Sequence, residues 1–239
     1  PGSQLREPVA VGRNGARDNW FLHLNVWDAH TPYRTPQNFG NPFENEPIPA
    51  WLSEDVRQKH WNGCGPHSAR EVLGYDLGLF GCDEPRQPEE MRDMEQVRRM
   101  FNGYDCGVRY ADDTVGRVLN RLADLGVLDE TAVIISADHG ENLGELNIYG
   151  DHQTADEFTS HVPLIVSWPG VTDKFAGQSR KMLVQHLDFA ATSIELLGQS
   201  VPANWDGVSF APQLRSGEDA GREFCAMSQG AWACQRGVR

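Results

Sequence analysis

The residues Thr131-Ala132-Val133-Ile134-Ile135-Ser136-Ala137-Asp138-His139-Gly140-Glu141 carry both the clearest strand pattern and the clearest site pattern in this chain. Their first half is a short apolar run rich in β-branched residues, which is typical of a buried strand. Their second half places a carboxylate, Asp138, beside an imidazole, His139, directly after that strand. Ligands of α/β sheets bind at the carboxyl ends of strands, so this junction is a candidate site.

Two more strands are predicted on either side of this stretch. Residues 20–27 are almost continuously apolar, which favours a strand buried on both faces, as in a parallel sheet. Residues 162–168 form a second apolar run that Pro169 and Gly170 close.

Helices are predicted between the strands. Apolar residues recur at steps of three and four from Met91 to Leu125, which indicates one helix face, and Gly126 is the expected stop. A second helix is predicted from Asp188, as its N-cap, to Leu197. Strands separated by helices and long loops predict an α/β fold with a mainly parallel central sheet flanked by helices.

The composition excludes several functional classes. The chain has 239 residues, with 34 acidic against 21 basic side chains and a formal net charge of −13. Nucleic-acid binding and docking on an anionic membrane both need clustered Lys and Arg, so neither is expected. No apolar run approaches the ~18 residues of a membrane span.

Further histidines follow the predicted strands. His30 comes three residues after the first strand, and His152 lies in the loop after Glu141, next to Asp151. A carboxylate and an imidazole at a strand end can bind one divalent cation, and nearby histidines can hold an anion or protonate a leaving group. Each piece also has a purely structural reading, as a cap, a turn residue or an exposed loop side chain.

The order of these motifs resembles that of a known family. Residues 131–145 are similar to the sulfatase signature, a strand followed by Asp-His/Asn-Gly-Glu, and residues 161–170 continue it. Residues 30–33 resemble the family's His-x-Pro-Tyr loop, and residues 186–188 and 206–209 resemble its later blocks. The similarity covers about residues 19–215, in order, and the chain resembles a type I sulfatase of the alkaline phosphatase superfamily.

The resemblance implies roles for four residues and a fold. The fold would be part of an alkaline-phosphatase-like α/β sandwich. Asp138 and His139 match two ligands of a divalent cation, calcium in the first instance, with magnesium, manganese and zinc as alternatives. His30 matches the catalytic histidine near the bridging oxygen of the sulfate ester, and His152 stands where many members carry a substrate-binding Lys. These four side chains are expected to converge in one cleft.

Two family motifs are absent from the sequence: the N-terminal aspartate pair and the Cys-x-Pro-x-Arg motif, whose Cys becomes formylglycine, the nucleophile. The segment Cys64-Gly65-Pro66-His67-Ser68 lacks the Arg and follows His30, so Cys64 is rejected as the nucleophile. We therefore expect an internal or C-terminal fragment, inactive alone, with the formylglycine in a missing N-terminal segment. Its expected parts are a loop or truncated N-terminal part at 1–18, part of the catalytic domain at 19–215 and the start of a truncated C-terminal region at 216–239.

The function implied is metal-dependent hydrolysis of sulfate esters, on a sulfated carbohydrate or small molecule. A phosphonate monoester or phosphodiester hydrolase of the same superfamily would use the same Asp-His pair. An inactive sulfatase-like protein that binds glycans is the third reading. By resemblance alone the protein is expected outside the cytoplasm, and the oligomeric state is left open.

Overall fold

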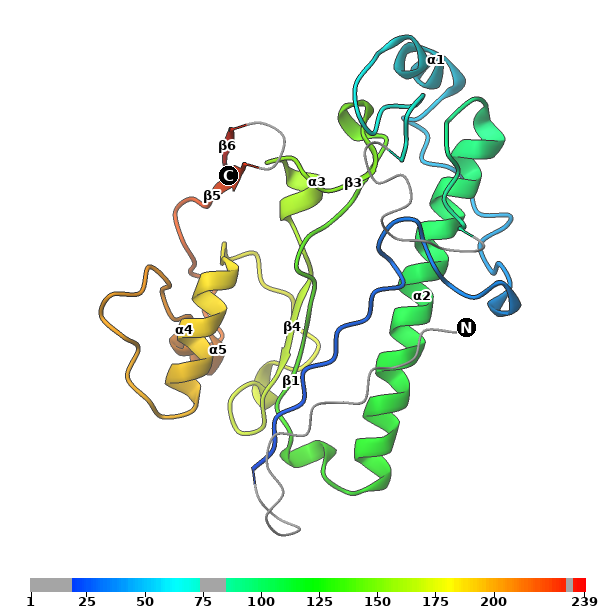
Figure 1. Ribbon diagram of the computed structural model, residues 1–239. Coiled ribbons are helices and arrows are strands. Elements are labelled where there is room, and N and C mark those ends of the chain that lie inside the picture. The colour runs from blue at the N-terminus through cyan, green and yellow to red at the C-terminus, as the bar shows by residue number, and fades with distance from the viewer. Residues whose placement is uncertain (1–18, 74–84, 231–233) are drawn as a thin grey trace. The chain divides into compact units, whose positions relative to one another are not determined.

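The computed structural model describes residues 19–73, 85–230 and 234–239, which form parts of two compact units (Figure 1). Unit 1 comprises Pro1–Leu119 and Asn142–Asp151, and unit 2 comprises Asn120–Glu141 and His152–Arg239. The segment 1–18, expected to be a loop, lies outside the described residues.

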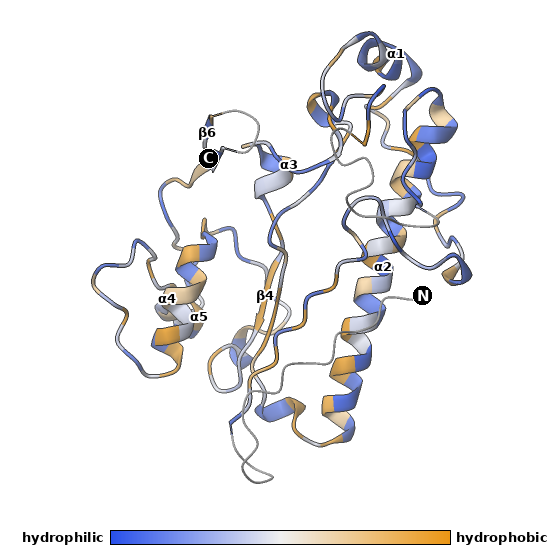
Figure 2. Ribbon diagram, in the orientation of Figure 1, coloured by the Kyte–Doolittle hydropathy of each residue, from blue (hydrophilic) through white to orange (hydrophobic). Residues whose placement is uncertain are grey.

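The longest element is helix α2, Met94–Asp124. Its hydrophobic and hydrophilic residues alternate in bands along the ribbon in Figure 2, as the three- and four-residue spacing predicts. Gly126 has a φ of +68°, and the amides of Gly126 and Val127 close a Schellman turn on carbonyls of the last helical turn. The predicted helix and its stop are confirmed, and Gly103 and Gly107 lie inside the helix without interrupting it.

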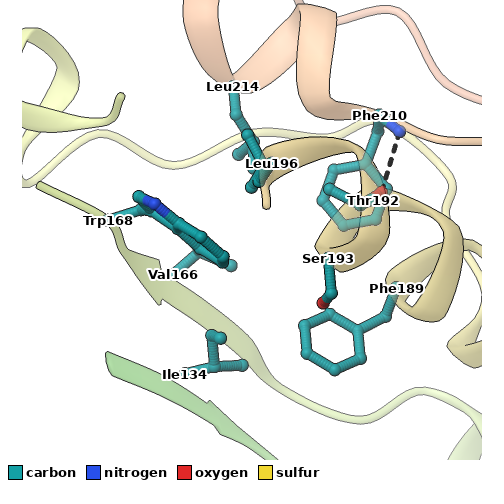
Figure 3. Close-up of a pocket in the computed structure, with 9 residues that line it drawn as sticks. All are labelled: Ile134, Val166, Trp168, Phe189, Thr192, Ser193, Leu196, Phe210 and Leu214. Atoms are coloured by element: carbon teal, nitrogen blue, oxygen red, sulfur yellow. Dashed lines mark hydrogen bonds between the residues drawn. The ribbon is translucent and has the colours of Figure 1, made fainter. Parts of the chain in front are cut away.

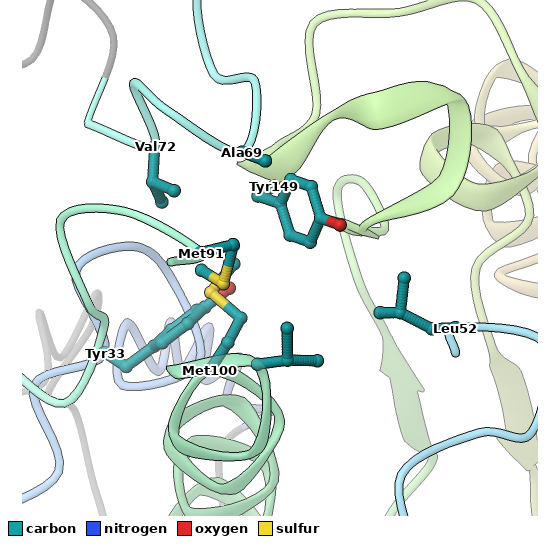
Figure 4. Close-up of a cluster of buried hydrophobic side chains, with 8 residues drawn as sticks. Tyr33, Leu52, Ala69, Val72, Met91, Met100 and Tyr149 are labelled. Carbon is teal, nitrogen blue, oxygen red and sulfur yellow. The ribbon is translucent and has the colours of Figure 1, made fainter. Parts of the chain in front are cut away.

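Unit 1 builds its core around the N-terminal half of α2. The other elements of this unit are η1 (Gln37–Phe39), α1 (Glu54–Asn62), β2 (Asn142–Leu143), η3 (Glu145–Asn147) and β3 (Tyr149–Asp151). Strands β2 and β3 pair antiparallel. The buried core side chains, shown in Figure 4, are Tyr33, Leu52, Ala69, Val72, Met91, Val97, Met100 and Tyr149. Several of them come from loops, so this core fixes the loops relative to α2.

Unit 2 contains the predicted strands as β1 (Val133–Ser136) and β4 (Leu164–Ser167). The same unit holds α4 (His186–Leu196) and α5 (Ala211–Ser216). The remaining elements are η2 (Leu128–Glu130), α3 (Glu157–Ser160), η4 (Asp173–Phe175) and the antiparallel pair β5 (Ala226–Gln229) and β6 (Gln235–Val238).

One face of the β1–β4 pair packs against α4 and α5. Ile134, Val166 and Trp168 point from the strand side toward Phe189 and Leu196 of α4 (Figure 3). The contact leaves no room for a water molecule. Burial of this apolar surface stabilises the sandwich by roughly 25 cal/mol for each Å² removed from water.

The strand pairing differs from the expectation in direction. The mixture of helices and strands agrees with the predicted α/β class, but β1 and β4 are antiparallel, with Ser136 opposite Leu164. The chain between two antiparallel strands leaves the first strand and enters the second at the same edge of the sheet. Here that is the edge where β1 ends and β4 begins. That edge therefore receives both the residues after β1 and the residues before β4.

The prediction of a strand at residues 20–27 is wrong. This segment pairs with none of the described strands, and Phe21 is 75% exposed instead of buried on both faces. Hydrophobic character alone does not make a strand, because the backbone needs a neighbouring chain with which to form hydrogen bonds.

Asp188 is not the N-cap of its helix. Helix α4 begins at His186 with Gln185 as the N-cap, and Asp188 is the third helical residue, closing a capping box by accepting from the Gln185 amide at 2.9 Å. The other oxygen of this buried carboxylate accepts from the Val208 amide at 2.7 Å. Arg222 completes the network as a bidentate donor. Asp188 thus ties the start of α4 to two later segments of unit 2.

Replacement of Arg222 tests this network. Arg222→Met leaves the carboxylate of Asp188 buried without its cation, which should cost about 3–5 kcal/mol of unfolding free energy. The matched control is Arg215→Met, which breaks the exposed pair with Glu195 and should cost at most about 1 kcal/mol. Urea denaturation of both variants measures the difference, and equal losses would contradict the assigned role of Arg222.

The same network predicts how stability depends on pH. Burial alone would raise the pKa of Asp188, but the hydrogen bonds from Arg222, Val208 and Gln185 lower it below its usual value. The unfolded state therefore binds more protons, and this stabilisation is complete above the unfolded pKa of about 3.9 and is lost as pH falls through the folded pKa. Between about pH 5 and 2, the unfolding free energy of Asp188→Asn should vary less steeply than that of the parent. Parallel curves would exclude a lowered pKa.

Candidate active site

The loop after β1 carries Asp138 and His139 and is fixed by backbone contacts. The amide of Gly140 donates to the carbonyl of Thr159 at 2.8 Å, at the end of α3. A Cβ at Gly140 would overlap the carbonyl oxygen of Phe158, so only glycine fits this approach. His186 adds a third contact, with its Nε2 3.0 Å from the carbonyl of Ala137. The loop is thus held on both sides of the Asp-His pair.

Asp138 and His139 are arranged to share a ligand. The carbonyl of Gly140 accepts from His139 Nδ1 at 2.8 Å, and a carbonyl can only accept, so Nδ1 carries a proton and Nε2 is the ligand atom of the neutral ring. That Nε2 is 3.8 Å from Oδ1 of Asp138, whose side chain is 84% exposed. A cation about 2.0–2.6 Å from each atom fits between them. Metal-binding histidines characteristically donate their other ring N–H in this way.

His152 lies directly on His139. The two rings stack with centroids 3.6 Å apart and an interplanar angle of 15°. Nδ1 of His152 is 3.3 Å from Oε2 of Glu141, and the Glu141 side chain is only 4% exposed. Glu141 is thus a buried carboxylate that can orient the His152 ring. Asp138, His139, Glu141 and His152 form one polar cluster in unit 2.

His30 lies in unit 1, in a turn that follows Trp27. Its ring stacks on the indole of Trp27, with centroids 4.6 Å apart, and its Nδ1 is 2.8 Å from the carbonyl of Thr31. The turn is closed by the amide of Tyr33, which donates to the carbonyl of His30 at 2.9 Å. Of the four predicted site residues, three lie together in unit 2, and the convergence of His30 with them stays a prediction.

The sequence did not predict two residues that support the loop of the site, His186 and Arg222. His186 belongs to the block at 186–188 that resembles the family, but nothing in the sequence indicates its contact with Ala137, 49 residues away. Arg222 carried no sequence signal, because a bidentate partner 34 residues from Asp188 follows no local spacing.

The fold is similar to that of solved hydrolase structures. The phosphonate monoester hydrolase from Silicibacter pomeroyi matches with a TM-score of 0.59 at 24% identity, over 81% of this chain and 37% of that one. The predicted α/β class is confirmed by this likeness. Among the described helices, none combines the length and the apolar character that crossing a membrane requires.

The sequence comparisons identify the family to which the chain belongs. The family model described as "Sulfatase" matches residues 9–199. The choline-sulfatase of Rhizobium meliloti (strain 1021) is 28% identical over 206 residues, 85% of this chain and 37% of that protein. The N-acetylglucosamine-6-sulfatase of Bos taurus is 32% identical over 197 residues, 82% and 32% of the two chains. The chain belongs to the sulfatase family and spans about a third of the length of these relatives.

Manganese titration tests the Asp138–His139 pair. Bound Mn²⁺ broadens the NMR signals of nearby nuclei, so the ring signals of His139 and His152 should broaden at the lowest Mn²⁺ concentrations. Asp138→Asn removes an anionic oxygen ligand and should raise the Mn²⁺ concentration needed at least about tenfold, since even indirect partners of metal ligands are worth that much.

The control for this titration is Asp129→Asn, which changes an exposed carboxylate in η2 of the same unit. It should leave the broadening unchanged. Equal effects of the two substitutions, or broadening spread evenly over exposed acidic residues, would contradict a site at this pair.

Proposed function

We propose that this chain supplies part of the active site of a sulfate ester hydrolase acting on a sulfated carbohydrate. The observation that carries the proposal is the spacing of 3.8 Å between His139 Nε2 and Asp138 Oδ1, with His152 stacked alongside, in a member of the sulfatase family. The substrate class is supported by the relative named N-acetylglucosamine-6-sulfatase, at 32% identity.

Asp138 and His139 are the residues that would hold a divalent cation. Such a cation, once bound, polarises sulfate oxygens and offsets the negative charge that develops on them. Calcium suits the carboxylate oxygen of Asp138, and magnesium, manganese or zinc remain the alternatives, zinc being the one best matched to an imidazole. The carbonyl of Gly140 keeps the His139 ring in the tautomer that a ligand needs.

His30 and His152 are proposed to act on the ester itself. When a nucleophile attacks sulfur, the bond from sulfur to the bridging oxygen breaks and the departing alkoxide needs a proton. His30 is the proposed donor near that oxygen, and His152, oriented by Glu141, is proposed to hold the sulfate group. The nucleophile is proposed to be a formylglycine hydrate from a segment outside this sequence.

Hydrolysis of phosphonate monoesters is the second candidate, because the likeness to a phosphonate monoester hydrolase covers 81% of the chain. An inactive glycan-binding relative is the third. Assay of the complete protein on matched sulfate, phosphonate and phosphodiester esters of one alcohol separates these three functions, and we expect the sulfate ester to be the best substrate.

Substitution of His139 tests the site within that assay. His139→Ala in the complete protein should lower kcat/KM for the sulfate ester about 100-fold or more, the size of loss found for one electrostatic contributor in an active site. The matched control is His161→Ala, which removes an exposed histidine before β4 that pairs locally with Glu157 at 3.0 Å and should change kcat/KM less than about twofold.

Two further outcomes bear on the same proposal. The chain of 239 residues by itself should not turn over the ester, and Cys64→Ala in the complete protein should be neutral. Loss of activity on changing Cys64, or equal effects of His139→Ala and His161→Ala, would contradict the proposed assignment.

A further inference from the structure

Helix α2 approaches the His30 turn through two glycines. Gly103 and Gly107 are both buried and lie one helical turn apart, on the same face. A Cβ at Gly107 would lie 2.6 Å from the carbonyl oxygen of Asp28 and 2.7 Å from Cα of Ala29. Both atoms belong to the backbone, so no side-chain rotation can relieve the clash. The helix backbone therefore touches the chain one or two residues before His30.

Gly103 contacts the other end of the turn. A Cβ there would lie 3.0 Å from Cδ2 of Tyr33 and 3.0 Å from Cβ of Arg86. The ring of Tyr33 is fully buried and packs edge-on against Tyr104 of the same helix, with centroids 5.9 Å apart. The two nearest atoms at Gly103 are side-chain atoms, with the carbonyl oxygen of Arg86 next at 3.2 Å, whereas the three nearest atoms at Gly107 all belong to the backbone.

A second segment, residues 86–87, forms backbone hydrogen bonds with the end of the turn. The amide of Gln87 donates to the carbonyl of Pro32 at 3.1 Å, and the amide of Arg86 donates to that of Tyr33 at 3.2 Å. Within the turn, the ring of His30 is set by its stacking on Trp27 and by the carbonyl of Thr31. His30 therefore lies between two backbone contacts, that of Gly107 with residues 28–29 before it and that of Tyr33 with Arg86 after it.

We propose that Gly107, assisted by Gly103, is a positioning residue that sets where the His30 imidazole lies, through direct contact of helix and turn backbones. The consequence for catalysis rests on the role of His30 in the proposed function. A methyl group at position 107 has to push the Asp28–Ala29 backbone away by about 1 Å, and a misplacement of that size costs on the order of 100-fold in rate.

Three substitutions of one kind test this. Gly107→Ala, Gly103→Ala and Gly116→Ala all add one methyl group to α2, and a Cβ at Gly116 has nothing within 4 Å. Alanine favours the helix over glycine at all three positions. We expect kcat for the sulfate ester in the complete protein to be unchanged in Gly116→Ala, lowered several-fold in Gly103→Ala and lowered about 100-fold in Gly107→Ala. If Gly107→Ala does not fold, the difference between Gly103→Ala and Gly116→Ala decides the matter.

A readout through His30 separates positioning from general damage. If the imidazole protonates the leaving oxygen, its displacement should lower kcat more for an alkyl sulfate than for a nitrophenyl sulfate, whose leaving group needs little protonation. Gly107→Ala should also add little to the loss already caused by His30→Ala, because both act through one group. Equal losses on both esters, or fully multiplicative effects of the two substitutions, would overturn the proposal.

The position of His30 can also be tested without an activity assay. In NMR spectra of the 239-residue chain, Gly107→Ala should shift the ring signals of His30 and the amide signals of residues 28–31 and Tyr33, and Gly116→Ala should not. Unchanged signals in Gly107→Ala would overturn the proposal. If Gly107→Ala shifts these signals but the parent protein hydrolyses no sulfate ester, the positioning role of Gly107 is supported and the proposed function is refuted. The two failures are therefore distinguishable.

Discussion

The pairing of β1 with β4 is the constraint on which the cluster in unit 2 depends. Antiparallel register places Ser136 opposite Leu164, so the chain leaving β1 and the chain entering β4 lie at one edge. The hydrogen bond from the Gly140 amide to the Thr159 carbonyl continues this contact beyond the strands. The loop that carries Asp138 and His139 is therefore held at the sheet edge by a backbone hydrogen bond of its own.

A second constraint reaches the same loop from the helix layer. Asp188 fixes the first turn of α4 by accepting from Gln185, Val208 and Arg222. His186 is the first residue of that helix and contacts the carbonyl of Ala137, the residue before Asp138. A buried charge whose main role is structural is thus coupled, through one helical turn, to the placement of the Asp-His pair. Loss of Arg222 is expected to loosen this loop as well as to destabilise unit 2.

Local patterns were sufficient to predict the elements that make their own hydrogen bonds or bury a regular face. The helix ending before Gly126, the strands at Val133–Ser136 and Leu164–Ser167, and the proximity of Asp138 to His139 all follow from periodicity, a stop residue or adjacency. The strand expected at 20–27 failed because pairing depends on a neighbouring chain, which a hydrophobic run does not reveal.

The parts of the site that could not be predicted rest on contacts between backbones. Gly107 and Gly140 matter because a Cβ would meet another segment of chain, and no side chain marks such a contact in a sequence. The stacking of His152 on His139 also depends on how the chain returns after β3, which spacing alone does not fix. The family resemblance supplied His152 as a candidate residue, and the structure supplied its orientation through Glu141.

The acidity of the chain places a condition on any anionic substrate. A net charge of −13 acts weakly across the molecule, because physiological salt screens exposed charges beyond about 8 Å, so the nearest groups decide. The exposed anionic group of the cluster is the carboxylate of Asp138, 84% exposed and 3.8 Å from the Nε2 of His139. On its own, that carboxylate repels a sulfate ester. The arrangement suits an anion only if Asp138 is neutralised by a bound cation, and this makes metal binding by Asp138 and His139 the step from which the rest of the proposed function follows.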